Sequence, residues 1–213
     1  MNILVCCPTR DRADIAAQFA DSVARTSNAH VAFYIDEDQV DRYSSLFKHQ
    51  GGRLHTIIGP RIGSAQAYNA LYRAFPHFDV YGMCADDSEF SPTNWDKNLE
   101  RVIRQFPNGI GVAATHNGSH IQFPFVTRRW IELVGWVPQG FRHYAIDGVL
   151  QMLGEDTHLV FLDPKDVALE HKDARTNQSI GDDAVTFMLW CVTKKRYSSA
   201  ILRNAMVPTN VTA

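Results

Sequence analysis

Short apolar runs alternate with helical periods along the first hundred residues of the chain. Residues 3–7 form a continuous apolar run, the pattern of a strand buried on both faces, and further strands are predicted at the β-branched and aromatic segment 30–35, at 54–58 and at the apolar segment 80–84. Helices are predicted between them at residues 15–25, 40–48 and 64–75. Strands that alternate with helices in this way form βαβ units, so the first half predicts an α/β fold with a parallel sheet.

The second half has a less regular pattern. It predicts helices at residues 95–106, 130–133, 146–153 and 184–192, and strands at 110–114 and 159–162. We expect Asp182 and Asp183 to cap the last of these helices, and the basic residues 194–196 to mark its C-terminal end. Because no internal repeat or proline- and glycine-rich linker interrupts the chain, a single domain over residues 1–213 is the simplest organisation.

The composition is that of an ordinary globular protein. Of the 213 residues, 45% are hydrophobic and 21% are charged, which argues against a disordered tail, a collagen-like fibre and a small disulfide scaffold. The formal net charge is -2, so there is no global basic field to drive non-specific nucleic-acid binding.

Cysteine spacing and the N-terminal pattern exclude further classes. The four cysteines form no C-x-x-C pair, so neither a zinc site of ordinary spacing nor a disulfide framework is expected. No basic segment precedes the first apolar run, and no apolar run approaches the length of a membrane span. We therefore expect a soluble, cytoplasmic protein without a transmembrane segment.

Three polar loops follow predicted strands, at residues 8–12, 36–38 and 86–89. Parallel sheets bind ligands at the carboxyl ends of their strands, where these loops would meet. Asp86 and Asp87 are adjacent carboxylates at the end of an apolar strand, and they would repel each other there. A divalent cation such as Mg²⁺ or Mn²⁺ would relieve this repulsion. The alternative is a solvated turn in which Asp87 or Ser88 caps a helix.

The order of these motifs resembles a known family. A Pro-Thr-Arg-Asp-Arg loop follows the first strand, Asp36 follows the second, and Gly-Ser-Ala-Gln-Ala-Tyr-Asn and Met-Cys-Ala-Asp-Asp-Ser-Glu follow at residues 63–69 and 83–89. Over residues 2–172 the chain resembles the GT-A fold nucleotide-sugar glycosyltransferases, particularly the family 2-like branch. The resemblance implies a single GT-A-like domain with a mostly parallel central sheet flanked by helices. A Rossmann-like nucleotide-sugar-binding half would span residues 1–100, and an acceptor-side half with a C-terminal helix would span residues 101–213.

The resemblance also implies the residues that bind the donor and the metal. Nucleotide-sugar contacts fall on Pro8, Thr9, Arg10, Arg12, Asp36, Arg61, Gly63, Asn69 and Asp86. Asp87 aligns with the last acid of the D-x-D-type motif, the usual direct ligand of Mn²⁺ or Mg²⁺. Ala85 replaces an acid of the longer Asp-x-Asp-Asp form of the motif. Asp86 would therefore either contact the nucleotide or support the metal ligands without binding the metal itself. Tyr68 stands where the family often has an arginine, so Arg61 or Arg10 would substitute as the phosphate contact.

In the second half the resemblance places residues 123–138 on the acceptor side and assigns two further roles. Asp147 resembles the catalytic base, which an inverting displacement requires near the anomeric carbon. Its alternative role is to cap the helix that follows. His171 occupies the position of a third metal ligand in many members, and its alternative is a surface histidine in a charged loop.

The resulting hypothesis is a metal-dependent glycosyltransferase that uses a nucleotide diphosphate sugar. A nucleotidyltransferase of related fold ranks lower, because the loop after the first strand lacks the glycines that cradle phosphate in that class. A non-catalytic nucleotide-sugar-binding domain is the other alternative. The acceptor stays open among a saccharide, a small molecule and a modified nucleic-acid base.

Overall fold

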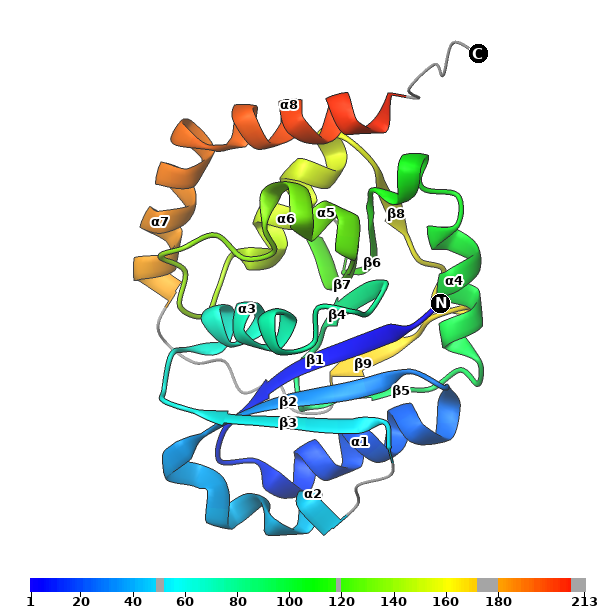
Figure 1. The fold of residues 1–213 in the computed structure, drawn as a ribbon, viewed down its shortest axis with the longest axis vertical. Helices are drawn as coiled ribbons and strands as arrows, with labels where there is room; N and C mark the ends of the chain where they lie inside the picture. The colour runs from blue at the N-terminus through cyan, green and yellow to red at the C-terminus, as the bar shows by residue number, and fades with distance from the viewer. Residues whose placement is uncertain (49–51, 118–119, 172–179, 208–213) are drawn as a thin grey trace.

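A seven-stranded sheet runs through the computed structural model, which describes residues 1–48, 52–117, 120–171 and 180–207 (Figure 1). In spatial order the strands are β3 (Leu54–Gly59), β2 (His30–Asp36), β1 (Ile3–Thr9), β4 (Val80–Met83), β7 (His120–Thr127), β6 (Val112–Asn117) and β8 (Leu159–Phe161). Only β7 among these strands runs against its neighbours, pairing antiparallel with both β4 and β6. The prediction of an α/β fold with a mostly parallel sheet is therefore confirmed.

Helices cover both faces of the sheet, as Figure 1 shows. They are α1 (Ala13–Thr26), the 3-10 helix η1 (Glu37–Tyr43), α2 (Ser44–Lys48), α3 (Ser64–Ala74), α4 (Trp95–Ile103), the 3-10 turn η2 (Pro107–Gly109), α5 (Arg128–Val134), α6 (Ile146–Asp156), α7 (Ile180–Thr193) and α8 (Lys195–Met206). None of the described helices is long and apolar enough to cross a membrane.

Strand β1 shows how the sequence builds two cores. Leu4 and Cys6 point to the face packed by α3, α5 and α6, whereas Val5 and Cys7 point to the face packed by α1 and α4. All four side chains are fully buried, because alternate residues of a central strand face opposite sides of the sheet. Each core also contains residues from beyond position 100, such as Trp130 on the first face.

Several elements differ from the sequence-based expectations. The 40–48 segment begins as the 3-10 helix η1, and the basic residues 194–196 open the separate helix α8 instead of ending the chain's last helix. The short antiparallel pair of β5 (Ser88–Phe90) and β9 (Leu169–His171) was not predicted, because three-residue strands carry no usable period.

The strand β7 was also missed. Pro124 lies within it, and proline in a run argues against a central strand. The resemblance placed this segment on the acceptor side, but Phe125 and Val126 are fully buried in the middle of the sheet. This part of the chain therefore builds the core between the two halves.

Candidate functional site

A cavity of about 930 Å³ opens at the carboxyl ends of β1 and β2. Loops after these strands, the start of α3 and a loop of the second half supply its walls. The lining residues are Pro8, Thr9, Arg10, Asp11, Arg12, Tyr34, Asp36, Arg61, Gly63, Ser64, Ala67, Ala85, Asp86, His143 and Tyr144. Eight of the nine residues expected to contact the nucleotide sugar thus surround one space. Asn69 is the ninth and does not line it.

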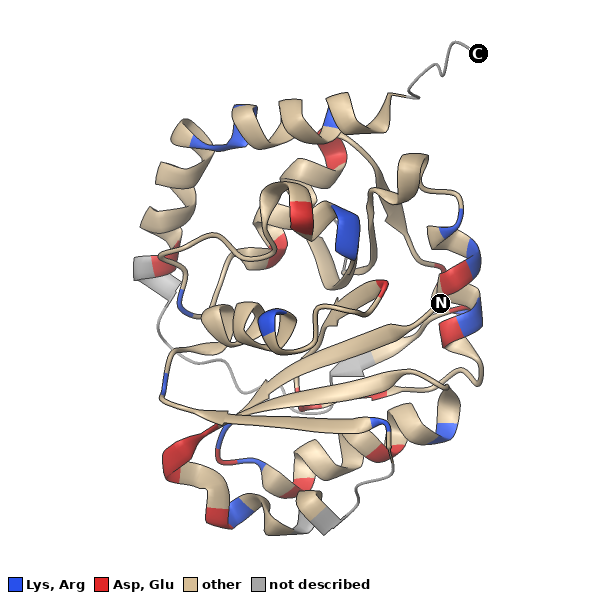
Figure 2. Ribbon diagram, viewed as in Figure 1, with Lys and Arg blue, Asp and Glu red and all other residues tan. Residues whose placement is uncertain are grey.

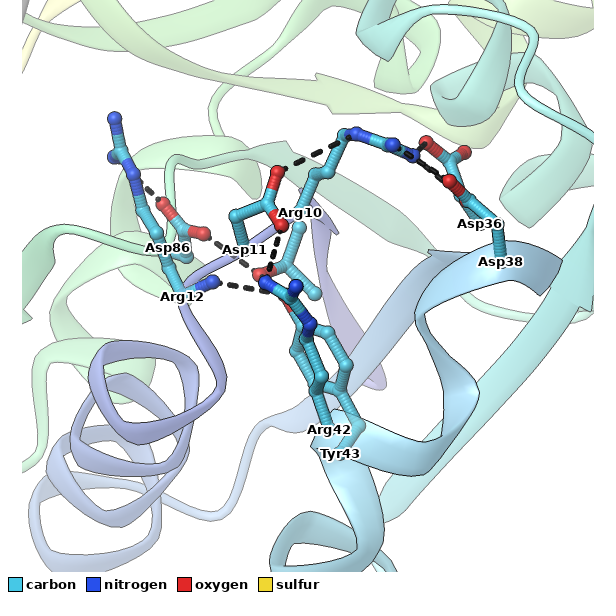
Figure 3. Close-up of polar contacts among 9 residues, drawn as sticks. Arg10, Asp11, Arg12, Asp36, Asp38, Arg42, Tyr43 and Asp86 are labelled. Carbon is cyan, nitrogen blue, oxygen red and sulfur yellow. Dashed lines mark hydrogen bonds and ion pairs between the residues drawn. The ribbon is translucent and has the colours of Figure 1, made fainter.

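The loop after β1 supplies one wall, and Arg10 fixes its conformation (Figure 3). Arg10 Nη1 donates to Asp36 Oδ2 at 2.7 Å, and its two terminal nitrogens donate to the Asp38 carboxylate at 2.8 and 2.6 Å. These bonds lower the pKa of Asp38 to about 2. Asp36, the expected nucleoside contact, and its neighbour Asp38 therefore share one guanidinium at this end of the cavity.

A buried chain of hydrogen bonds supports Asp86 at the other end. Thr9 Oγ1 donates to Asp86 Oδ2 at 2.7 Å and lies 2.9 Å from the Tyr43 hydroxyl. The Tyr43 hydroxyl also accepts from the backbone N–H of Arg12 at 3.2 Å. Burial raises the pKa of Asp86, while Thr9 and Arg12 act to lower it. Thr9 and Arg12, from the end of β1 and its loop, thus hold the carboxylate in one orientation, and Tyr43 of η1 supports both of them.

Arg12 lies between the two adjacent acids. Its Nη1 is 3.1 Å from Asp86 Oδ1 and 2.8 Å from Asp87 Oδ2, and each aspartate is only 6% exposed. Oxygens of both carboxylates therefore converge on one position, where a guanidinium nitrogen offsets their repulsion. No group of three histidine, cysteine or acidic side chains that could hold a metal occurs within the described residues.

His171 is placed only by its backbone. It ends β9 and pairs with Ser88 of β5, the residue directly after Asp87. The side chain of His171 lies outside the part of the chain that the structure describes.

The first turn of α3 forms the floor of the cavity. Gly63 precedes the helix with φ +78°, and a Cβ there would lie 2.8 Å from the carbonyl oxygen of Arg142. The same carbonyl accepts a hydrogen bond from the backbone N–H of Ala65 at 2.9 Å. One turn further on, Asn69 faces away from the cavity and pairs with both backbone groups of Val137. Its described contacts are therefore structural.

The opposite wall comes from the loop at residues 142–144, which includes His143 and Tyr144. His143 Nδ1 lies 3.1 Å from Ser64 Oγ, so this loop contacts the start of α3. Asp183 holds the loop from its other side. Its Oδ1 accepts from the backbone N–H of Arg142 at 2.7 Å, and its Oδ2 accepts from those of His143 and Tyr144, both at 2.8 Å. Asp183 was expected only as a helix cap, because its partners are backbone groups forty residues away.

Asp147 lies in the first turn of α6, three residues after the cavity-lining Tyr144. The N-cap of this helix is Ala145, so the capping role considered for Asp147 is wrong. Its Oδ1 accepts from the backbone N–H of Gly148 at 2.9 Å. Reduced hydration raises the pKa of Asp147, although the residue reaches solvent. It stands beside the cavity and is not part of its lining.

A second, smaller hollow of about 560 Å³ lies behind the acid pair, between α1 and β5. Asp86 lines both spaces, so the acid pair separates them. Figure 2 shows acidic and basic residues gathered around the carboxyl ends of β1, β2 and β3, whereas most of α7 carries no charge.

Comparison with known proteins identifies the fold. No protein-family model matches the sequence, and no curated protein matches it. Among solved structures, S. aureus TarS 1-349 in complex with UDP matches with a TM-score of 0.59 and 12% identity, over 78% of this chain and 59% of that one. The mannosyltransferase PcManGT from Pyrobaculum calidifontis, in complex with GDP-Man and Mn²⁺, matches with a TM-score of 0.60 and 12% identity.

The PcManGT match covers 96% of this chain and 73% of the mannosyltransferase. A 4-diphosphocytidyl-2C-methyl-D-erythritol synthase from Anaerococcus prevotii also matches, with a TM-score of 0.54 and 11% identity over 87% of this chain. This chain spans 43% of the longer TarS structure, so it is much shorter than that protein. The seven-stranded mixed sheet and these matches together show that the chain has the GT-A glycosyltransferase fold.

Proposed function

We propose that the chain is a metal-dependent glycosyltransferase, which moves a sugar from a nucleotide diphosphate sugar to an acceptor hydroxyl. The single observation that carries the proposal is the convergence of Asp36, Asp86 and the loop after β1 on one cavity. The structurally similar TarS and PcManGT were solved with UDP and with GDP-Man and Mn²⁺, respectively, which supports a donor of this class.

The donor would lie along the cavity, with its nucleoside toward Asp36 and its diphosphate toward Asp86. Arg61 lines the space and supplies a positive charge for phosphate oxygens. The floor is the start of α3, whose backbone amides favour negative charge. Arg10 would keep the Asp36 carboxylate in place while it accepts hydrogen bonds from the nucleoside.

The acid pair fits a divalent cation, because Arg12 Nη1 already shows that Asp86 and Asp87 oxygens converge on one positive group. Asp87 would be the direct ligand, with Asp86 beside it and His171 as a further ligand. A bound Mn²⁺ or Mg²⁺ would offset the charge on the departing diphosphate. Arg12 would release the acid pair and contribute its own charge to the same phosphates.

Asp147 would act as the base. As the acceptor oxygen bonds to the anomeric carbon, the bond from that carbon to the diphosphate oxygen breaks, and Asp147 takes the acceptor's proton. This displacement would invert the anomeric configuration. The raised pKa of Asp147 suits a proton acceptor, because a carboxylate with a higher pKa binds the proton more strongly.

The donor half is tested by substituting Asp87. Thermal stabilisation by UDP-sugars and GDP-sugars, each measured with and without Mn²⁺, should be metal-dependent in the native protein and lost in Asp87→Ala. The matched control is Asp14→Ala, which removes an exposed acid from the first turn of α1. Unchanged metal-dependent binding in Asp87→Ala would overturn the assignment of the acid pair.

The chemical half is tested by Asp147→Asn. We expect donor binding to persist while release of nucleoside diphosphate falls by about 100- to 10,000-fold, the range for loss of a general base. The assay follows nucleoside diphosphate with a mixture of saccharides as acceptors. Transfer at the native rate in Asp147→Asn would show that another group takes the proton.

A nucleotidyltransferase is the second candidate, and the match to the diphosphocytidyl synthase favours its inclusion. That reaction would release pyrophosphate from a nucleoside triphosphate, whereas a glycosyltransferase releases a nucleoside diphosphate. Measuring which product accumulates decides between the two. A non-catalytic binding domain would give neither product while still binding the nucleotide sugar.

A further inference from the structure

Asp183, in the first turn of α7, is an acidic side chain that is almost fully buried. It is 1% exposed, and burial of an isolated carboxylate is costly. Three consecutive backbone N–H groups, those of Arg142, His143 and Tyr144, donate to it. These bonds offset the burial and leave the pKa of Asp183 below its ordinary value, so the side chain is charged in the folded protein.

The loop that Asp183 holds is also attached on its other side. The carbonyl of Arg142 accepts from the N–H of Ala65, and His143 Nδ1 lies 3.1 Å from Ser64 Oγ. The loop therefore lies between the start of α3 and the first turn of α7, two elements more than a hundred residues apart. A Cβ on Gly63 would meet the Arg142 carbonyl, so the approach of the loop to α3 is close.

This attachment determines part of the cavity wall. His143 and Tyr144 line the cavity, whereas Asp183 does not. Asp147 follows in the first turn of α6, whose N-cap Ala145, with φ +61°, comes directly after the loop. A displacement of the loop would move the wall of the cavity and the start of α6 together.

We propose that Asp183 is a positioning residue for the donor site: it fixes the 142–144 loop so that His143 and Tyr144 complete the cavity around the sugar-diphosphate part of the donor. The inference rests on the proposed function for the identity of the ligand. The role of Asp183 in placing the loop rests only on its three hydrogen bonds and does not depend on the identity of the ligand. The two statements can therefore be tested by different measurements.

The first measurement is hydrogen exchange of the full chain without any ligand. In Asp183→Ala the amides of Arg142, His143 and Tyr144 should exchange much faster, while the amides of β1 and β2 keep their protection. Unchanged protection of these three amides would overturn the placement of the loop. This result does not depend on whether the protein is a glycosyltransferase.

The second measurement is donor affinity, with UDP-sugars and GDP-sugars in the presence of Mn²⁺ as probes. Asp183→Ala should weaken binding of the best probe by about 10- to 100-fold, the scale expected for the loss of one hydrogen bond to a charged group. The matched control is Asp96→Ala, which removes another buried acid that accepts a backbone N–H, on α4 away from the cavity. It should lower the melting temperature and leave the affinity unchanged.

A double substitution separates positioning from general stability. If Asp183 acts through His143, Asp183→Ala combined with His143→Ala should bind the donor no more weakly than Asp183→Ala alone. Fully additive losses would contradict the proposal. If Asp183→Ala fails to fold, Asp183→Asn replaces it, because the amide keeps one acceptor oxygen and loses the charge. Native affinity in Asp183→Asn with an exposed 142–144 loop would also overturn the proposal.

The two hypotheses fail in different ways. If the native protein binds no nucleotide sugar in any metal condition, the proposed function fails, and the exchange experiment still decides the role of Asp183 in the loop. If the native protein binds a donor and the Asp183 variants bind it equally well, the positioning role fails and the function stands.

Discussion

Thr9 connects two buried polar groups under the cavity. Its hydroxyl donates to Asp86 and also contacts the hydroxyl of Tyr43, so one small side chain serves an acid and a phenol. A buried carboxylate that loses its donor is left with an unsatisfied oxygen, which costs more than the bond itself contributes. Together with Arg12, Thr9 therefore stabilises the charged form of Asp86.

Replacing this hydroxyl should give a stability loss that depends on pH. In Thr9→Val we expect the free energy of unfolding to fall by about 1–3 kcal/mol at pH 7. The pKa of Asp86 should rise further in the variant, because the charged form loses a donor. The loss should shrink as the pH falls and Asp86 becomes protonated in both proteins. Urea unfolding at several pH values measures this difference.

Thr115→Val is the control for that experiment. Thr115 donates to the backbone carbonyl of Gln122, which does not titrate. The loss of stability in Thr115→Val should therefore be the same at each pH. A pH-independent loss in Thr9→Val as well would show that the hydroxyl does not support the charge on Asp86.

A pair of histidines on β2 and β3 makes stability sensitive to mild acid. His30 Nδ1 lies 2.9 Å from His55 Nε2, and the rings stack with centroids 5.2 Å apart. Burial lowers the pKa of both side chains, and the neighbouring histidine lowers that of His30 further. The folded state thus binds fewer protons than the unfolded state once the pH falls to about 6.5.

The stability that this pair contributes is fully present above about pH 6.5. It is lost as the pH falls from there toward the lowered pKa values of the two histidines in the folded protein. Urea unfolding of the native protein and of His30→Gln at pH 7.5 and 5.5 should therefore show a larger decline in the native protein. Equal declines would mean that the pair does not contribute to the pH dependence.

At the scale of elements, the junction between the 142–144 loop and α3 leaves no room for a side chain. Gly63 has φ +78° and faces the Arg142 carbonyl, so an alanine there is strained in its backbone and crowded at its Cβ. We expect Gly63→Ala to lower the free energy of unfolding by about 1–3 kcal/mol and to weaken donor binding.

Gly109→Ala separates these two effects. Gly109 has φ +67°, but a Cβ there would meet nothing within 4 Å. The cost of Gly109→Ala should therefore report the backbone strain alone, and the excess cost in Gly63→Ala should report the contact with the loop. Urea denaturation measures the loss of unfolding free energy in both variants. Equal losses would show that the 142–144 loop moves aside to accommodate the Cβ at position 63.

The elements that could be predicted from sequence are those with a strong local period. The apolar run of β1 and the helical spacing of α3 are of this kind, and both lie where we expected them. Other features depend on partners far along the chain. The strand β7 contains Pro124, and only its burial between β4 and β6 makes it a strand. Asp183 is recognisable only when its three backbone donors are placed around it.

The candidate site followed the same division. The order of motifs in the first half brought Thr9, Arg10, Arg12, Asp36 and Asp86 to one cavity, because parallel strands present their ends at one edge. Asn69 was placed there by its motif alone, and the helix turns it toward Val137 instead. The role of Arg12 between the two acids has no signal in sequence, since it depends on a side-chain conformation.

At the scale of the whole molecule, the two halves share one sheet and two cores. The β4–β7 pairing joins them, and both cores mix residues from before and after position 100. We therefore expect a single cooperative unfolding transition, with tryptophan fluorescence and far-UV circular dichroism giving the same midpoint. Trp95 and Trp136 lie in different cores and report on both. Two separate transitions would show that the halves are independent domains.

The contacts of Asp183 also set an order of events during synthesis. The β1 loop and α3 leave the ribosome early, but the backbone N–H groups of residues 142–144 gain their carboxylate acceptor only when residue 183 has been made. Two residues that are far apart in the sequence can contact each other only after the second of them has been synthesised. A growing chain that ends before α7 would therefore carry the acid pair and an incomplete cavity, so the binding site would mature only when the last helices have emerged.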